Sequence, residues 1–88
     1  MINENITIVV NTFKSEDKIF NCLDSINSFC KVIIIENSNN INFKKKIEEK
    51  YPFIDCYLTG ENLGYAKGNN LGLSKVKSKY ALILNPDT

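Results

Sequence analysis

The chain has 88 residues and a mass of 10.0 kDa, which limits it to one small domain or a part of a larger one. Its 43% hydrophobic and 24% charged residues suffice for a packed core and argue against disorder. Eleven lysines face ten acidic residues, and the formal charge of +1 gives no reason to expect nucleic acid as a partner. No apolar run approaches the roughly 18 residues of a membrane span, so we expect a soluble cytosolic chain.

The residues available for chemistry are restricted, because the chain has three cysteines and no histidine. Cys22, Cys30 and Cys56 lack the paired spacing of a zinc site, and we expect buried free thiols. Without histidine there is no Ser-His or Cys-His nucleophile. Any reaction must therefore use carboxylates, hydroxyls, amides, lysines or a bound metal.

The first half of the chain reads as strand, helix, strand. Residues 6–10 form a β-branched run that predicts a buried strand. Ser15 is a suitable N-cap for a following helix, whose apolar stripe we place at four positions. These positions are Ile19, Leu23, Ile26 and Cys30. Residues 31–35 then predict a second buried strand, which ends at turn-forming residues.

The second half continues the alternation of helix and strand. Residues 43–50 are rich in lysine and predict a short helix with one solvated face. Residues 54–58 predict a third strand, residues 65–75 a helix, and residues 80–84 a fourth strand.

This alternation predicts an α/β fold with a Rossmann-like parallel sheet of about four strands and helices on both faces. We expect the order 3-2-1-4, because the first strand must be central if the polar loops are to converge. Ligands of such sheets bind beyond the carboxyl ends of the strands. Residues 11–13, 36–38 and 85–87 each follow a predicted strand, and we expect all three segments along that edge.

The four glycines, at positions 60, 64, 68 and 72, match neither the dinucleotide fingerprint nor a P-loop. Gly68 and Gly72 fall within a predicted helix, where each costs about 1 kcal/mol relative to alanine. Close packing of the helix on the sheet and close approach of a ligand to the backbone both explain them. The terminal residues 85–88 (NPDT) also have two explanations, an ordinary turn and a carboxylate placed for a cation and a phosphate.

Four blocks of the chain resemble family 2 glycosyltransferases. They are residues 6–13 (ITIVVNTF), 32–39 (VIIIENSN), 62–73 (NLGYAKGNNLGL) and 81–88 (ALILNPDT). The last two blocks are most similar to the rhamnosyltransferase-like branch. The resemblance implies the A-type glycosyltransferase fold and inverting transfer of a sugar from a nucleoside diphosphate sugar, with Mg²⁺ or Mn²⁺.

The resemblance also implies roles for individual residues. Asn11, Thr12 and Phe13 match the segment along the nucleoside, and Glu36 takes the place of an Asp that hydrogen-bonds the base. The residues that match positions beside the base and diphosphate are Asn62, Lys67 and Asn70. The segment from Asn85 to Asp87 takes the place of an Asp-x-Asp motif, and Asp87 matches its metal-binding acid.

In this family the acceptor site and the catalytic base come from a later half, so no catalytic residue is assigned. We expect residues 1–88 to be a single truncated domain, a fragment or a shortened reading frame, that binds the donor and is inactive alone. The acceptor of the complete enzyme would be a saccharide or a lipid-linked saccharide, in the cytoplasm or at the inner membrane face. The alternative is a small non-catalytic α/β domain that serves self-association or partner binding. Because later strands would normally cover it, the free edge of the fourth strand is expected to pair with another copy or to remain mobile.

Overall fold

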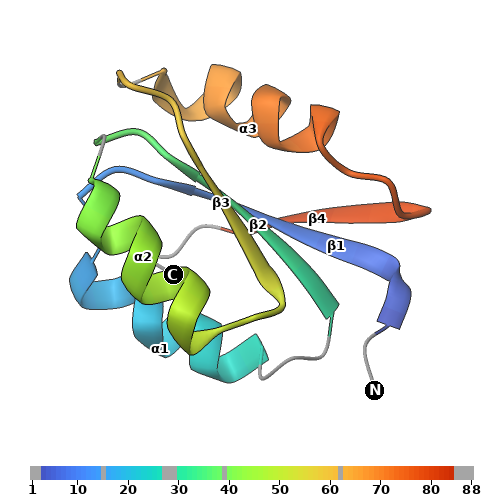
Figure 1. The fold of residues 1–88 in the computed structure, drawn as a ribbon. Helices are drawn as coiled ribbons and strands as arrows, with labels where there is room; N and C mark the ends of the chain where they lie inside the picture. Colours follow the sequence, from blue (N-terminus) through green and yellow to red (C-terminus); the bar gives the residue numbers. More distant parts are fainter. Residues whose placement is uncertain (1–2, 15, 27–29, 39, 62, 85–88) are drawn as a thin grey trace.

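A computed structural model defines the fold and describes residues 3–14, 16–26, 30–38, 40–61 and 63–84. Strands and helices alternate along the chain (Figure 1). In chain order they are β1 (Asn3–Thr12), α1 (Glu16–Ile26), β2 (Cys30–Glu36), α2 (Ile41–Lys50), β3 (Ile54–Leu58), α3 (Gly64–Ser74) and β4 (Tyr80–Leu84). The predicted order of elements is therefore confirmed.

The four strands form one parallel sheet in the order β3-β2-β1-β4. β1 lies between β2 and β4, with Val9 opposite Ile33 on one side and Ile83 on the other. The β-branched residues of β1 and β2 are buried on both faces, as central strands of a parallel sheet require. The predicted fold class and strand order are confirmed.

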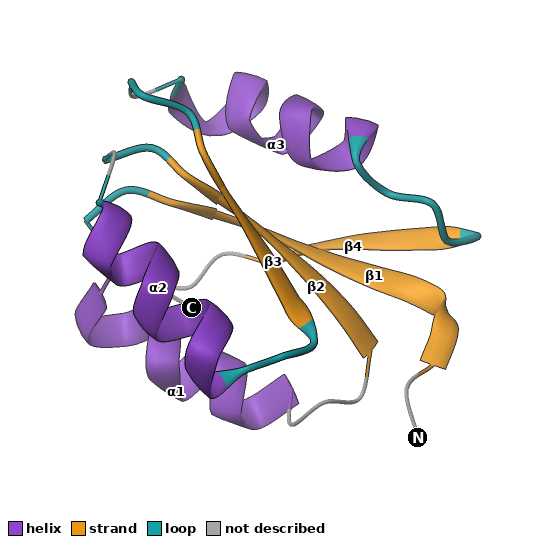
Figure 2. Ribbon diagram, viewed as in Figure 1, coloured by secondary structure: helices purple, strands orange, loops and turns teal. Residues whose placement is uncertain are grey.

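The helices cover both faces of this sheet. In Figure 2, α1 and α2 lie on one face and α3 lies on the other. Because side chains alternate along a strand, neighbouring residues of β1 belong to different layers. Ile8 and Val10 belong to the main core, whereas Val9 faces α3. The other buried members of the main core are Ile19, Leu23, Cys30, Val32, Ile34, Phe43, Ile47, Tyr51, Phe53, Ile54 and Cys56.

Gly72 allows α3 to approach the sheet closely. A Cβ atom at this position would collide with Cγ1 of Val9 and would lie 3.3 Å from Cγ1 of Ile35. Both side chains are β-branched and fully buried, so neither can move aside easily. Of the two explanations for Gly72, the structure supports close helix packing.

Helix α2 begins two residues before the predicted helix. Asn40 is its N-cap, and the Asn40 Oδ1 accepts a hydrogen bond of 3.0 Å from the backbone N–H of Phe43. Phe43 and Ile47 are buried against the sheet. The lysine-rich segment is thus solvated on one face only, as expected.

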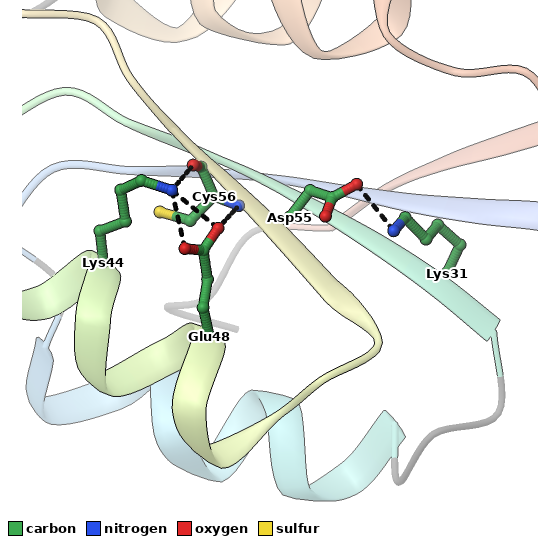
Figure 3. A network of polar contacts seen from close by, with 5 residues as sticks. All are labelled: Lys31, Lys44, Glu48, Asp55 and Cys56. Carbon is green, nitrogen blue, oxygen red and sulfur yellow. Dashed lines mark hydrogen bonds and ion pairs between the residues drawn. The ribbon is translucent and has the colours of Figure 1, made fainter.

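Two charged residues of α2 are attached to β3. Lys44 Nζ lies 2.8 Å from Glu48 and donates a 2.9 Å hydrogen bond to the carbonyl of Cys56 (Figure 3). Glu48 Oε2 in turn accepts from the backbone N–H of Cys56 at 3.1 Å. Desolvation opposes ionisation of Glu48, but the bonds from Lys44 and Cys56 outweigh it and lower the pKa of Glu48. This pair satisfies backbone groups at the edge strand of the sheet.

One predicted boundary is wrong, because Cys30 does not belong to the helical stripe. Helix α1 ends at Ile26, and Cys30 is the first residue of β2, paired with Asn3. Cys30 lies an even number of residues before Val32 and Ile34, so it fits the buried face of that strand as well as the spacing of a helix. The bounds of β3 and β4 match the prediction, and those of β1, β2, α2 and α3 differ from it by at most three residues. Ser15, the predicted N-cap of α1, lies outside the described residues.

The cysteines are free, as expected, and Cys30 and Cys56 are buried while Cys22 is half-buried. Burial raises the pKa of the Cys56 thiol to about 12. None of the helices, in the part of the chain that the structure describes, is long and apolar enough to span a bilayer.

The Gly72→Ala variant should unfold at a lower urea concentration than the parent chain. Overpacking against Val9 costs about 1–3 kcal/mol, which exceeds the gain of about 1 kcal/mol in helix propensity. The loss should shrink in a Val9→Ala background, since the colliding methyl group is gone. An exposed site on the same helix provides the control, Lys67→Ala. If Gly72→Ala is more stable than the parent, the close packing of α3 is not a constraint.

Candidate functional site

The carboxyl ends of the strands meet at one edge of the sheet, which we call the carboxyl edge. Thr12 at the end of β1 lies opposite Glu36, and Glu36 lies opposite Leu58 at the end of β3. The polar residues of the first two predicted loops therefore lie side by side, as expected. The third segment, residues 85–87, lies outside the described residues.

Asn37 links three segments of the carboxyl edge. Its Nδ2 donates to Asn11 Oδ1, to the carbonyl of Thr12 at 2.9 Å, and to the carbonyl of Ile35 at 3.2 Å. Its Oδ1 accepts from the backbone N–H of Leu63 at 3.1 Å. Asn37 is only 3% exposed, so these bonds satisfy an amide that water does not reach.

The amide of Asn11 extends this connection to α3. Asn11 Nδ2 donates a 3.2 Å hydrogen bond to the carbonyl of Gly64, where α3 begins. Gly64 has φ of +82°, a conformation that favours glycine. The chain of bonds from Asn37 through Asn11 to Gly64 thus sets where α3 starts above the sheet.

Gly68 faces the same side chain. A Cβ atom on Gly68 would lie 2.6 Å from Cγ of Asn11, which leaves no room for any larger residue. Close packing therefore explains Gly68 as well, and the group it packs against is a predicted nucleotide-binding residue.

A second polar cluster lies on the opposite face of the sheet. Glu36 is 1% exposed, and its Oε1 accepts hydrogen bonds from the hydroxyl of Thr12 at 3.0 Å and from the N–H of Ser38 at 3.3 Å. Its Oε2 accepts from the hydroxyl of Ser38 at 2.9 Å. The carboxylate thereby joins the ends of β1 and β2.

Thr59 was not predicted as a site residue, although it secures the loop after β3. Its backbone N–H donates to the carbonyl of Glu36 at 3.1 Å, and its hydroxyl contacts Asn37 Oδ1 at 3.4 Å. Asn37 was likewise recognised only as part of a polar cluster. Its position directly after a buried strand was the available signal, because a polar residue at the carboxyl edge meets the ends of neighbouring strands.

On α3 the structure buries Asn69 and exposes the predicted Asn70. Asn69 is 5% exposed, and its Oδ1 has no hydrogen-bond partner. The sequence signal for the burial of Asn69 was helical spacing, because Asn69 precedes the buried Gly72 by three residues and so shares its side of the helix. A buried acceptor without a donor is unusual, and it makes Asn69 a stronger candidate for an inward-facing role than Asn70.

The remaining predicted residues are more peripheral or are not described. The Phe13 ring is 45% exposed, and Lys14 Nζ lies 5.2 Å from its centroid. Lys67 and Asn70 are both exposed on α3. Three predicted residues, Asn62, Asn85 and Asp87, lie outside the described residues. The structure thus brings Asn11, Thr12 and Glu36 together and leaves Phe13 accessible beside them.

The described residues of the carboxyl edge do not form a set of ligands for a cation. Within residues 3–14, 16–26, 30–38, 40–61 and 63–84 there is no group of three or more His, Cys, Asp or Glu side chains suited to a metal. Glu36 is already engaged by Thr12 and Ser38.

Comparison with known proteins agrees with this architecture. The sequence pattern of the family described as Glycosyl transferase family 2 matches residues 7–88. The low-salt glycan biosynthesis hexosyltransferase Agl10 of Haloferax volcanii is 28% identical to this chain over an alignment 89 residues long. The alignment covers 96% of this chain. The chain spans 28% of the length of Agl10. Because the family pattern extends over nearly all of its residues, the chain belongs to glycosyl transferase family 2.

Proposed function

We propose that residues 1–88 are the donor-binding part of a glycosyltransferase that uses a nucleoside diphosphate sugar and a saccharide or lipid-linked acceptor. The observation that carries this proposal is the hydrogen-bonded carboxyl edge, where Asn11, Asn37 and Gly64 join β1, β2 and α3. Ligands of parallel α/β sheets bind at this edge. The membership in glycosyl transferase family 2 makes a nucleotide sugar the appropriate ligand class.

Two side chains at the edge, one aromatic and one acidic, are suited to the nucleoside. The exposed ring of Phe13 offers a surface for stacking, since it is 45% exposed. Among the described residues, Glu36 Oε2 accepts a hydrogen bond from Ser38, and a carboxylate oxygen can accept two. We propose that the base donates the second, that Asn62, Lys67 and Asn70 lie beside the base and diphosphate, and that Asn85 contacts the nucleotide sugar.

We further propose that Asp87 holds Mg²⁺ or Mn²⁺ together with the diphosphate. One carboxylate binds such a cation weakly, and the diphosphate oxygens would complete the coordination. The cation would stabilise the leaving diphosphate during inverting displacement. The acceptor-activating base is assigned to a part of the enzyme beyond residues 1–88, so this chain should not transfer sugar alone.

The donor sugar and the subgroup are further proposals. The block at residues 62–73 supports the rhamnosyltransferase-like branch, and Agl10 is named a hexosyltransferase. Both are consistent with transfer of a six-carbon sugar. A cytoplasmic location, at the inner membrane face for the complete enzyme, belongs to the same proposal.

The donor proposal predicts metal-dependent binding of a nucleoside diphosphate without sugar transfer. Titrating uridine and thymidine diphosphates with Mg²⁺ by NMR should shift the amides around residues 11–13 and 36–38. Asp87→Ala should remove the metal-dependent part of the shift. Glu36→Gln, which keeps an acceptor for Thr12, should reduce discrimination between the bases while preserving the fold.

The control is Glu49→Ala, which removes an exposed acid of α2 and should leave both effects unchanged. Shifts confined to residues 44–50 that survive the Asp87 and Glu36 substitutions would indicate non-specific attraction and contradict donor binding. Sugar transfer by residues 1–88 alone would contradict the assignment of the base to another part of the enzyme.

The Asn37→Ala variant should weaken both the fold and the donor edge. It leaves the backbone N–H of Leu63 without its side-chain partner, which costs about 1–3 kcal/mol, while the carbonyl of Thr12 keeps the 2.9 Å bond from the backbone N–H of residue 37. Urea unfolding measures the loss, and hydrogen exchange at Leu63 should become faster than in the parent. Asn21→Ala, at an exposed position of α1, should stay within about 0.5 kcal/mol of the parent. Unchanged exchange at Leu63 would show that Asn37 does not hold this loop.

Strand β4 supports the proposal that this chain self-associates. Leu82 and Tyr80 are 52% and 59% exposed, and no other strand of the described residues pairs with the outer side of β4. An apolar unpaired edge is a template for another strand. The alternative function, a non-catalytic association domain, would rest on this same surface without nucleotide binding.

Leu82→Lys should therefore reduce the self-association of residues 1–88 in sedimentation experiments, because a charge at the edge opposes strand pairing. The matched control is Ile41→Lys, since Ile41 is similarly exposed, at 56%, but begins α2. A chain that sediments as a monomer at all concentrations, with or without the substitution, would rule out pairing through β4.

A further inference from the structure

A polar cavity lies at the opposite end of the strands from the carboxyl edge. Its volume is about 480 Å³, and its lining includes Thr7 of β1, Asp55 of β3 and Ser78 from the segment between α3 and β4. Along β1, Thr7 lies five residues before Thr12 at the carboxyl edge, a separation of about 16 Å at roughly 3.3 Å per residue. The cavity is therefore distinct from the proposed donor site.

The cavity concentrates positive charge. Lys31, Lys75 and Lys77 contribute to its lining, whereas Asp55 is its single acidic residue. Lys31 Nζ lies 2.7 Å from Asp55 Oδ2, and Figure 3 shows these two side chains directed toward one another. The charges of Lys75 and Lys77 are not matched by a second acid of the lining. Two net positive charges thus face a cavity of a chain whose total formal charge is +1.

The hydroxyl groups of the lining are already engaged. Ser78 Oγ donates to the carbonyl of Tyr80 at 2.7 Å, so Thr7 Oγ1 donates to Ser78 Oγ at 2.7 Å. Each hydroxyl has one hydrogen, and both are used. A ligand would therefore receive its hydrogen bonds from the ammonium groups, which favours an anion.

The same cavity has a less polar wall. Lys75 Nζ lies 4.9 Å from the centroid of the Tyr57 ring, and Ile33 also contributes to the lining. The ring and the aliphatic side chain offer contact area to an organic group beside the cationic groups. A bare inorganic ion would leave that wall unused.

We propose that this cavity binds a phosphate monoester attached to a small organic group. The second pKa of a phosphate monoester is about 6, so near neutral pH it carries close to the two negative charges that match Lys75 and Lys77. The volume of about 480 Å³ lies within the range of roughly 300–1,000 Å³ that small-molecule sites occupy. The site is separate from donor binding and does not require it.

The test is an NMR titration of residues 1–88 with phenyl phosphate at constant ionic strength. We expect saturable shifts of the Thr7, Ile33 and Ser78 amides, with Asn37 at the carboxyl edge unaffected. A parallel titration with vesicles containing phosphatidic acid distinguishes a free ester from a lipid headgroup. Saturation of the cavity amides by either ligand supports the proposal and identifies the source of the phosphate.

Variants separate a built site from general surface charge. Lys75→Gln combined with Lys77→Gln should weaken binding about tenfold or more, because the two charged donors to the phosphate are removed. Lys75→Arg combined with Lys77→Arg keeps both charges and should retain binding. The matched control, Lys45→Gln combined with Lys46→Gln, removes the same charge from α2 and should leave affinity unchanged.

Three results would overturn the proposal. One is the absence of saturable shifts at the cavity amides with both ligands. Another is equal weakening by the control pair on α2, which would mean that net charge alone attracts the anion. The third is binding that competes with a nucleoside diphosphate at Asn37, which would place the phosphate at the carboxyl edge instead.

Discussion

The buried amide of Asn37 is the interaction on which the carboxyl edge depends. It bonds to the end of β1, to the end of its own strand and to the loop before α3. An amide in this position has two hydrogens and two acceptor lone pairs, and the surrounding backbone uses both kinds. Losing the bond to Leu63 would leave a backbone N–H without its partner, whereas the carbonyl of Thr12 would keep its bond from the backbone N–H of Asn37, so side chain and backbone together hold the segments.

The position of α3 follows from the hydrogen bonds of this edge and from Gly64, Gly68 and Gly72. Gly64 places the start of the helix at Asn11, while Gly68 and Gly72 remove the side chains that would push it away from β1. Gly68 and Gly72 let the helix approach β1 at these two positions, and α3 covers one face of the sheet (Figure 1). Close packing and the proposed donor site are thus coupled, because Asn11 belongs to both.

The two ends of the sheet carry different chemistry. The carboxyl edge presents amides and the buried carboxylate of Glu36, whose bonds are directed among neighbouring loops. The amino-terminal end on the α3 face presents Lys75 and Lys77 around an open cavity. The α1 and α2 face is filled by apolar side chains and is closed by the Lys44 and Glu48 pair at β3. A small sheet with helices on both faces can therefore offer two separate polar sites without an interruption of its main core.

The sequence by itself determined the alternation of elements, because buried β-branched runs and helical stripes are local signals. The parallel sheet and the strand order followed from that alternation and from the polar segments after the strands, which must converge at one edge. It left the boundary at Cys30 undecided, since that residue fits both a helical and a strand period. Only the tertiary structure decided that Gly68 packs on Asn11 and that Asn37 joins the ends of two strands and the loop before α3. The basic cavity was also invisible in the sequence, because Lys31 and Lys75 come from distant segments. These features depend on contacts between residues far apart in the chain, and such contacts are set by how the layers pack and not by any local pattern.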